Sequence, residues 1–452
     1  SKKGFLPMRA LRRLFHFLLE LQGAVILSAE IVRELGEVLI TVRRRSHAVP
    51  RCSNCSREMG GEVVLKRRRW RHRDLIGRRC YVIADIREAR CPVHGRRLER
   101  VPWASSGARH TRDFDRQVAS LVQVADKSAA ARMFEVAWRT VGRIVTRVVG
   151  ELLPEDLLDN LVEIGVDETA YKRGHRYLTV VSCLRTGRVI WVGEGKTAET
   201  LGRFFEKLGP ERSRRLKVIA MDMSGSFFKA VKKWAPKADI VFDRFHVVKL
   251  LLDAVDEIRR EECSRLTGTA RKALKDTRFT FLRNPRHHTE KDLDAIKRIQ
   301  STNNRLARVY QLRVDFEDLW ELKNQKLARS FITYWTRYAL LSRREPLRRF
   351  AKTLREKVDG IVGFFRHGGL TNATLEGMNN KIKLVIHRAF GFHNVDSLIA
   401  MVHLCCTGIV VTDGVVYGQE SHHVSVAVFY IDVVTSVGSL EPISLPLRNR
   451  HF

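Results

Sequence analysis

Acidic residues are scarce in this chain. Asp and Glu number 50 against 82 Lys and Arg, which gives a formal net charge of +32 at pH 7 and a pI near 10.4. So large an excess of one sign predicts a polyanionic partner and says nothing about the fold. A membrane surface is disfavoured, because no basic amphipathic helix stands next to an apolar anchor. We expect nucleic acid; the plainer alternative, a ribosomal or merely basic protein, fits poorly with the length of the chain and its buried-looking strands.

Long apolar runs are also missing. No segment approaches the roughly 18 uninterrupted apolar residues that a membrane-spanning helix needs. The first residues are basic and the stretch after them is broken by charges, which is unlike a secretory signal peptide. We therefore expect a cytoplasmic protein with no membrane partner.

Cysteine is sparse, and most of it looks structural. Of the eight cysteines, only Cys52, Cys55 and the neighbourhood of Cys91 have the spacing of metal ligands. The others lie mostly in apolar segments, where a thiol packs as a small hydrophobic side chain. This usage excludes a disulfide scaffold and indicates a reducing compartment.

The chain is long enough for two to four domains, and its 44% apolar content can supply their cores. Two short strands are expected at 24–31 and 37–42, a turn-rich module at 50–100, and three helical segments at 113–124, 127–134 and 137–152. Five short β-like runs follow at 161–166, 177–184, 189–194, 216–221 and 240–242. The first three of these predict an antiparallel meander, and the last two, each preceded by a helical segment, predict parallel strands. Residues 247–365 read as all helix.

The first motif that carries chemistry is Cys52-x-x-Cys55 with Cys91-Pro-Val-His94. Three thiolates and one imidazole form a sound tetrahedral zinc set, and the two-residue gap lets each pair close on one ion. The alternative is an unrelated cysteine pair and a cysteine with an incidental histidine. We expect a structural Zn²⁺ held by Cys52, Cys55, Cys91 and His94.

A basic run lies in the insert between the two halves of this motif. Residues 66–73 carry six Lys or Arg around Trp70. A charge run is usually a solvated face, but a zinc module would fix this one beside DNA phosphates. We expect DNA contacts from Arg67, Arg68, Arg69 and Arg71.

The helical segment at 137–152 has the division that a recognition helix needs. Trp138, Val141, Val145 and Val148 are expected to face inward, while Arg139, Arg143 and Arg147 face outward. An apolar face docked on partner helices leaves basic side chains free for the major groove. Because helix-turn-helix signals are weak in isolation, an ordinary amphipathic helix is the alternative.

Three acidic residues stand in mostly apolar or small-residue surroundings. Asp167 and Asp222 each end an apolar strand, and Glu376 lies far downstream where a helix is expected to begin. Carboxylates on rigid elements can hold two Mg²⁺ or Mn²⁺ ions for phosphoryl transfer, because hard oxygen ligands suit these ions. A cap or a salt bridge is the usual role of a lone strand-end Asp. Here the order of strands and helices around the three favours a catalytic site.

Several longer motifs occur in a fixed order along the chain, at residues 69–74 with 89–95 and 101–104, then 165–168, 221–224, 243–249, 376–383 and 388–392. Together, over about residues 10–403, they resemble transposases of the ISL3 insertion-sequence family in the DDE superfamily. The resemblance implies a zinc-binding N-terminal domain, a helix-turn-helix and an RNase H-like core with a helical insertion. It also implies a catalytic triad of Asp167, Asp222 and Glu376.

The fold class expected from this resemblance is α/β and multi-domain, with an RNase H-like mixed-sheet core interrupted by an all-helical insertion. The domains are expected at 8–105 (zinc-binding), 109–153 (helix-turn-helix), 160–252 (first part of the core), 253–366 (insertion), 367–405 (last part of the core) and 406–452 (an atypical tail). The tail departs from the family pattern: residues 407–452 contain no Lys and only two Arg. An altered reading frame would explain it and would damage the last helix of the core.

The function implied is that of a bacterial DNA transposase that binds terminal inverted repeats, cuts 3′ ends with Mg²⁺ and joins them to target DNA. Lys172, Arg244, Lys381 and Lys383 would hold phosphates, with His246 either a nearby phosphate contact or a packed histidine. The expected partners are DNA and further copies of the chain in the active complex. The rival hypotheses are a non-catalytic zinc and helix-turn-helix regulator, and a nuclease of the same fold that does not join strands.

Overall fold

The structure is a computed structural model that describes residues 23–45, 49–172, 174–368, 373–388 and 394–412, together with Leu19 and Leu21. Residues 373–376 are described by their backbone alone. All of these lie in one unit of the chain, residues 1–414. Of the tail expected at 406–452, residues 413–452 lie outside the described residues. The segment before Leu19 also lies outside them.

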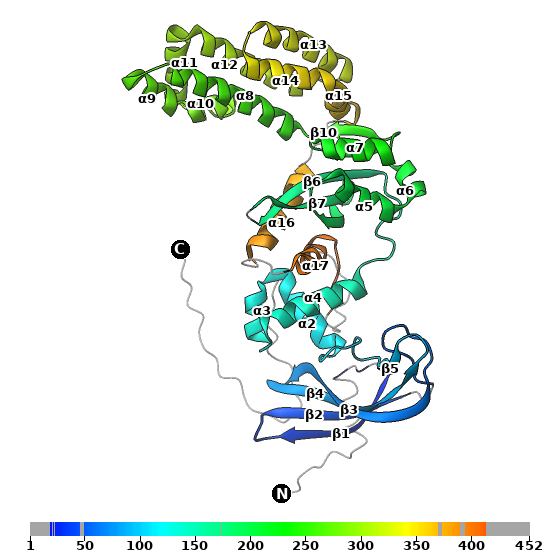
Figure 1. The fold of residues 1–452 in the computed structure, drawn as a ribbon. Helices are drawn as coiled ribbons and strands as arrows, with labels where there is room; N and C mark the ends of the chain where they lie inside the picture. The colour runs from blue at the N-terminus through cyan, green and yellow to red at the C-terminus, as the bar shows by residue number, and fades with distance from the viewer. Residues whose placement is uncertain are drawn as a thin grey trace, which may run out of the picture. The chain divides into compact units, whose positions relative to one another are not determined.

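The N-terminal part is a mixed five-stranded sheet (Figure 1). Its strand order is β1-β2-β4-β3, with β5 paired to β4. The strands are β1 (Ala24–Val32), β2 (Glu37–Arg44), β3 (Gly60–Leu75), β4 (Arg78–Cys91) and β5 (Gly95–Leu98). The first two confirm the predicted strands. The expected turn-rich module is instead dominated by a long antiparallel β3–β4 hairpin, which the charges of its exposed face had hidden. Trp70, Val82 and Trp103 fill the core beneath it.

Three helices follow, α2 (Arg112–Val124), α3 (Lys127–Met133) and α4 (Trp138–Leu152), in the positions predicted. Thr111 and Asp126 cap the first two, each accepting hydrogen bonds from free backbone N–H groups of the first turn. The apolar faces of α2 and α4 meet around Phe114, Val118 and Ile144, all of which are buried.

The second sheet is also mixed, and its strand order is β10-β9-β6-β7-β8. The strands are β6 (Glu163–Lys172), β7 (Arg176–Cys183), β8 (Arg188–Glu194), β9 (Val218–Met221) and β10 (Asp239–Phe242). Strands β6, β7 and β8 form an antiparallel meander, whereas β9 pairs in parallel with both β6 and β10. Both predictions about this sheet are confirmed.

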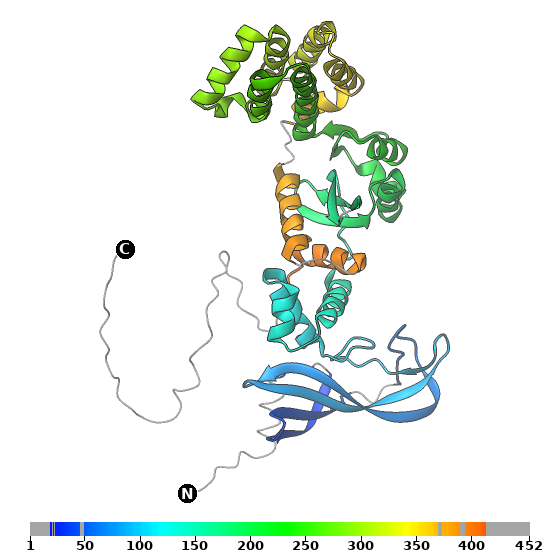
Figure 2. The ribbon, with the colours of Figure 1, turned by 60° about the vertical axis from the view of Figure 1, so that its left-hand side comes forward.

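Each face of the second sheet is covered by helices. Val181 and Ile219 join one core with α5 (Ala198–Leu208) and α7 (Gly225–Trp234), and the short α6 (Pro210–Arg215) lies between these two helices in sequence. Leu178 and Val180 join another core with α16 (Ala373–Arg388) and α17 (Val395–Cys406). Figure 2 shows α16 lying along β6, which it also contacts. The sheet is therefore a rigid platform buried on both sides.

An all-helical segment separates β10 from α16, as predicted. Its elements are α8 (Arg244–Ser264), α9 (Gly268–Asp276), α10 (Arg278–Leu282), η1 (Pro285–His287), α11 (Glu290–Thr302), α12 (Asn304–Glu317), η2 (Asp318–Glu321), α13 (Gln325–Leu341), α14 (Glu345–Glu356) and α15 (Val358–Arg366). No helix in the described part of the chain combines the length and the apolar character needed to cross a membrane.

The last described helix, α17, is formed and packed. α17 runs to Cys406 and contacts both α4 and β8. Ile409 and Val411, which belong to the expected tail, are buried in the core formed by α2 and α4. The atypical composition therefore begins within a segment that still packs.

Candidate functional site

Four side chains meet at the base of the β3–β4 hairpin. The ligand atoms of Cys52, Cys55, Cys91 and His94 all lie within 4.8 Å of one another. Cys55 Sγ is 3.6 Å from Cys91 Sγ, and Cys91 Sγ is 3.7 Å from His94 Nδ1. Cys91 ends β4 and His94 lies in the turn to β5, so the sheet holds one half of the cluster in place. The predicted residues are thus brought together as a set that could hold a metal ion.

The surroundings of Cys91 favour its thiolate form. Burial alone would raise the pKa of the Cys91 thiol, but the backbone N–H groups of His94 and Val93 and the side chains of His94 and Cys55 lower it to about 6. A thiolate is the form of cysteine that binds metals. A soft, closed set of three sulfurs and one nitrogen fits zinc.

The basic run lies on β3, where successive side chains point to opposite faces of the sheet. Arg67 and Arg69 are exposed, but each has an acidic partner: Asp85 lies 4.0 Å from Arg67, and Glu37 lies 2.7 Å from Arg69. Arg68 is half-buried. Since surface ion pairs of this kind are weak, DNA phosphates can replace the carboxylates.

Arg71 does not have the free guanidinium expected of a DNA contact. Its side chain is only 10% exposed, pairs with Asp74 and lies near the rings of Tyr81 and Phe114. Alternation along β3 places Arg71 on the face opposite to Trp70 and His72, where it lies against Phe114 of α2. The prediction for Arg71 is therefore wrong as to exposure, and its role is to join the hairpin to α2.

The helix α4 presents two of its three predicted arginines to solvent. Arg139 and Arg143 are exposed, whereas Trp138 is half-buried and carries the Lys127 ammonium 3.4 Å from its ring centroid. Arg147 donates two hydrogen bonds, of 2.8 and 3.0 Å, to the buried carboxylate of Asp115 on α2. The expected outward orientation is therefore wrong for Arg147, whose guanidinium ties α4 to α2.

Asp167 and Asp222 lie beside each other at the second sheet. Val166 of β6 is in register with Met221 of β9, so the residues that follow them lie side by side, Asp167 within β6 and Asp222 just after β9. The strand predicted to end at Val166 in fact continues to Lys172. Asp222 accepts a hydrogen bond of 2.9 Å from the backbone N–H of Ser224. Burial raises the pKa of Asp167, and the nearby charge of Asp222 raises it further, against lowering by the Glu168 N–H, His246 and Asn379. A buried carboxylate whose pKa is raised by a neighbouring carboxylate forms a site that a bound cation would stabilise.

Asn379 brings α16 to this pair. Its side-chain amide donates to the Asp167 carboxylate, and its oxygen accepts from the Thr169 hydroxyl at 3.3 Å. Glu376 precedes Asn379 by one helical turn on the same helix. The side chain of Glu376 lies outside the described residues, so its place at the site stays a prediction.

A third carboxylate shares this edge of the sheet. Phe242 of β10 is in register with Met221, which places Asp243 next to Asp222. Asp243 caps α8 by accepting from the Phe245 N–H at 2.9 Å, and it lies 3.8 Å from His246 Nε2. Arg244 turns instead toward the helical segment, 3.8 Å from Glu317 and 5.3 Å from the Trp320 ring centroid. The other predicted phosphate contacts, Lys172, Lys381 and Lys383, are exposed.

Comparisons with known proteins agree on one family. Residues 164–402 match the DDE domain of the ISL3 group, described as a transposase, and residues 99–149 match the helix-turn-helix domain of transposase family ISL3. The chain belongs to the ISL3 transposase family. It is 31% identical over 398 residues to the transposase for insertion sequence element IS1557 of Mycobacterium tuberculosis, covering 82% of this chain and 89% of that protein. It is also 31% identical over 317 residues to the transposase for insertion sequence element IS1001 of Bordetella parapertussis, covering 70% of this chain and 78% of that protein.

Three residues at the site of this ISL3 family member escaped sequence reasoning: Asn379, Asp243 and Lys357. Asn379 is neutral, and Asp243 stood in a motif of the family resemblance but was given no role. Lys357 lies in the helical segment, yet its ammonium donates to the backbone carbonyl of Met223, next to Asp222. The spacing of Glu376 and Asn379, one turn apart on a helix, was the available signal for Asn379.

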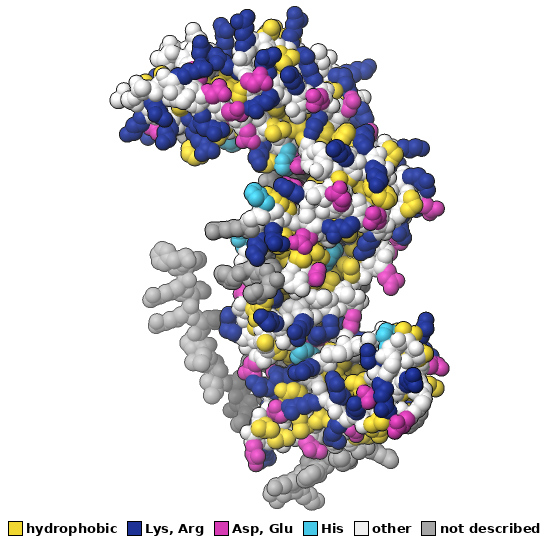
Figure 3. Space-filling view, viewed as in Figure 1, with side chains coloured by type: hydrophobic (Ala, Val, Ile, Leu, Met, Phe, Trp, Pro, Cys, Tyr) yellow, Lys and Arg dark blue, Asp and Glu magenta, His cyan; other side chains and the backbone are white. Residues whose placement is uncertain are grey.

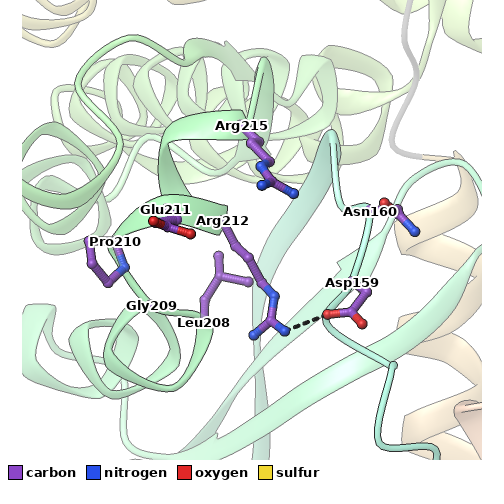
Figure 4. A pocket seen from close by; sticks show the side chains of 8 residues that line it. All are labelled: Asp159, Asn160, Leu208, Gly209, Pro210, Glu211, Arg212 and Arg215. Carbon is purple, nitrogen blue, oxygen red and sulfur yellow. Dashed lines mark ion pairs between the residues drawn. The ribbon is translucent and has the colours of Figure 1, made fainter.

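A separate cavity of about 580 Å³ lies at the opposite edge of the sheet (Figure 4). Its residues precede the starts of β6 and β9, and Arg212 reaches across it to Asp159 at 2.6 Å. Asp167 and Asp222 lie toward the other ends of these parallel strands. The cavity is therefore distinct from the acidic site.

Proposed function

We propose that this chain is a DNA transposase that binds the terminal inverted repeats of its insertion sequence, cleaves 3′ ends and transfers them to target DNA. Its family membership supports DNA cleavage and strand transfer as the activity. The observation that carries the proposal is the pairing of Asp167 with Asp222 at one edge of a rigid sheet, with α16 joined to them through Asn379.

Asp167, Asp222 and Glu376 would hold Mg²⁺ or Mn²⁺. The described donors are carboxylate oxygens on adjacent strands, which fit a hard divalent cation. Such ions supply Lewis-acid activation of the attacking oxygen and stabilise the leaving oxygen. The chain itself orients the carboxylates, through the Glu168 N–H on Asp167 at 2.6 Å, the Ser224 N–H on Asp222, and Asn379.

An RNase H-like core is the reading of the second sheet that we favour. A meander of three antiparallel strands extended by two parallel strands beside the first supports it. The expected divisions at 8–105, 109–153, 160–252, 253–366, 367–405 and 406–452 remain our proposal for the domains.

Recognition of DNA would be divided among three surfaces. Arg139 and Arg143 on α4 would read end DNA in the major groove, and Arg67–Arg69 on β3 would hold phosphates. The third surface is a groove of about 1,130 Å³ between α8, α9 and α10. Figure 3 shows Lys and Arg side chains gathered over these helices. The groove includes Arg271, Lys272 and Lys275, which are exposed, beside the exposed ring of Phe279. We define these four residues as the α9–α10 groove.

Zn²⁺ would be the structural ion of the cluster formed by Cys52, Cys55, Cys91 and His94. We also propose that the active complex contains more than one copy of the chain, because an element has two ends and each must be held. The zinc ion and the additional copies of the chain are both proposals that follow from the family assignment.

The test is cleavage of DNA that carries the element's end. Asp167→Asn, Asp222→Asn and Glu376→Gln keep side-chain shape but remove charge that would hold the ion. Each should abolish cleavage and strand joining while leaving end binding nearly intact. Asp294→Asn, a change of an exposed acid on α11, is the matched control. A wild-type chain that binds ends without cutting them would favour the non-catalytic regulator, and cutting without joining would favour a simple nuclease.

A further inference from the structure

The helical segment returns to the catalytic sheet through a close contact between α15 and β10. A Cβ atom added to Gly360 would lie 2.4 Å from the ring of Phe242, and one added to Gly363 would lie 3.1 Å from the carbonyl oxygen of Ile240. Only glycine permits this approach of helix to strand. At the far end of α15, Arg366 and His367 both contact the Asp239 carboxylate at 3.0 Å. Helix α15 is therefore held on β10 along its length.

This contact fixes Lys357, the residue that immediately precedes α15. Its ammonium donates to the carbonyl oxygen of Met223 and lies 5.4 Å from the centroid of the Phe242 ring. Both residues are next to acids of the site: Met223 follows Asp222, and Phe242 precedes Asp243. Lys357, which is 135 positions from Asp222 in sequence, therefore lies close to the end of β9, where Asp222 follows the strand.

The ammonium retains capacity to bind something else. A lysine has three N–H donors, and within the described residues a single acceptor, the Met223 carbonyl, contacts it. Burial lowers the pKa of Lys357, while the charge of Asp222 raises it. In the part of the chain that the structure describes, no carboxylate is within ion-pair distance of Lys357. The side chain is half-buried, so an approaching group can reach it.

We propose that Lys357 is a phosphate-binding residue of the active site, contacting a non-bridging oxygen of the DNA strand that is cut. The inference rests on the proposed function and deepens it, because it gives the helical segment a direct part in the chemistry. A compact ammonium suits this place, since it neutralises charge on a phosphate beside carboxylates that hold cations. Charge that develops on the phosphate in the transition state is stabilised by such a preorganised cation.

The first experiment measures single-turnover cleavage of end DNA by the full chain in Mg²⁺. Lys357→Met should slow cleavage by roughly 100-fold, and Lys357→Arg should recover at least about tenfold of that loss because the positive charge returns. The matched control is Lys352→Met, an equal loss of charge at an exposed position of α14, which should leave the rate within about twofold. A wild-type rate for Lys357→Met would overturn the proposal, while inactivity of Asp222→Asn in the same assay would still support the proposed function.

A second experiment does not depend on cleavage. The chain is treated with an amine-acetylating reagent in Ca²⁺, with and without end DNA, and labelling of each lysine is read by mass spectrometry. DNA should protect Lys357 and leave Lys352 labelled. Equal labelling of Lys357 with and without DNA would overturn the proposal even in a chain that cuts nothing. If Lys357→Met lowers the melting temperature and Lys357→Arg restores neither stability nor cleavage rate, the lysine only stabilises the backbone at Met223 and the proposal is overturned.

Discussion

At the scale of single residues, the acidic site combines side chains that sequence could predict with others that it could not. Asp167 and Asp222 were predictable because each follows an apolar strand, and the register of β6 with β9 confirms that they are neighbours. Asn379 was not predicted, because a neutral amide gives no charge signal and its spacing of one helical turn from Glu376 was the only sign of its place. The prediction for Arg71 was wrong as to its exposure, because the sequence does not show that Phe114 of α2 lies against this one of the six cations.

Asn379→Ala should slow cleavage by about 10–100-fold and raise the Mg²⁺ concentration needed for half the maximal rate. The amide that orients Asp167 is removed, and outer partners of metal-binding groups typically have effects of this size. Asn380→Ala, an exposed neighbour on the same helix, is the control and should cut normally. An unchanged Mg²⁺ requirement for Asn379→Ala would contradict its positioning role.

His72 should make the N-terminal sheet sensitive to acid. It is fully buried, hydrogen-bonded at 2.8 Å to Thr111, and burial lowers its pKa to about 3. The unfolded chain binds a proton near pH 6.5, so this contribution to stability is complete above that pH and is lost as the pH falls toward the folded pKa. Lowering the pH from 7.5 to 5 should reduce the free energy of unfolding by about 2 kcal/mol through this one group. Denaturant unfolding of wild type and His72→Asn at both pH values measures it; equal pH dependence in the two would sink the assignment.

At the scale of elements, helix and strand positions were largely predictable, whereas their partners were not. The 3.6-residue pattern located α2, α3 and α4 to within a few residues. The same pattern assigned Arg147 to the solvent side, because it cannot see that Asp115 of α2 offers a buried carboxylate at that point. Local periodicity predicts which side of a helix is apolar, but it does not predict which polar residues at the border of that side pair with another helix.

Two arginines on α4 should therefore behave differently. Arg143→Ala should lower the preference for end DNA over random DNA by about 1–3 kcal/mol for each base that the arginine reads, with little effect on stability. Arg147→Ala should instead lower the free energy of unfolding by about 3 kcal/mol, because it leaves the Asp115 carboxylate buried without its partner. Competition binding and denaturant unfolding separate the two. The assignment is wrong if Arg147→Ala keeps full stability and changes only the DNA preference.

The cluster of Cys52, Cys55, Cys91 and His94 gives a second prediction at this scale. Purified chain should contain one zinc ion, and Cys52→Ser should lose it and loosen residues 50–100, because the binding free energy of such a site is part of the folding free energy. Cys80→Ala removes a buried thiol of the same sheet that lies outside the cluster, so it should keep the metal. Elemental analysis with hydrogen exchange of the β3–β4 hairpin checks both. Zinc retained at full occupancy in Cys52→Ser would contradict the ligand set.

At the scale of the whole molecule, the net charge of +32 predicted DNA without locating its contacts. Much of the positive charge is paired: Asp256 lies within 4 Å of Arg259, Arg260 and Arg278, and Glu262 gathers three more arginines. The net charge does not distinguish cations that are paired with carboxylates from cations that are free to bind DNA. The α9–α10 groove is where the difference can be measured.

Replacing Arg271, Lys272 and Lys275 together by Gln should weaken binding to all DNA and reduce the slope of log affinity against log salt. Each phosphate that the chain no longer neutralises should lower that slope by about 0.9. The preference for end DNA should not change, because base reading is assigned to α4. Equivalent neutralisation of Arg212, Arg214 and Arg215 on α6 is the control. A slope that falls equally in both triple variants would show that bulk charge, and not the groove, is responsible.

The seating of the last described segment on the helix-turn-helix has a consequence for how the protein is made. Ala400, Met401, Leu404, Ile409 and Val411 complete the core of α2 and α4, and Gln123 of α2 donates to the carbonyl oxygens of Leu404 and Ile409 at 3.0 and 2.9 Å. Because a ribosome adds about 5–20 residues per second, roughly 10–50 s pass between synthesis of α4 and synthesis of α17. During that interval α2 and α4 expose an apolar face that residues 400–411 later cover. Ribosomes that stall or stop before residues 400–411 are made should therefore release products that are prone to aggregation and poor at binding DNA.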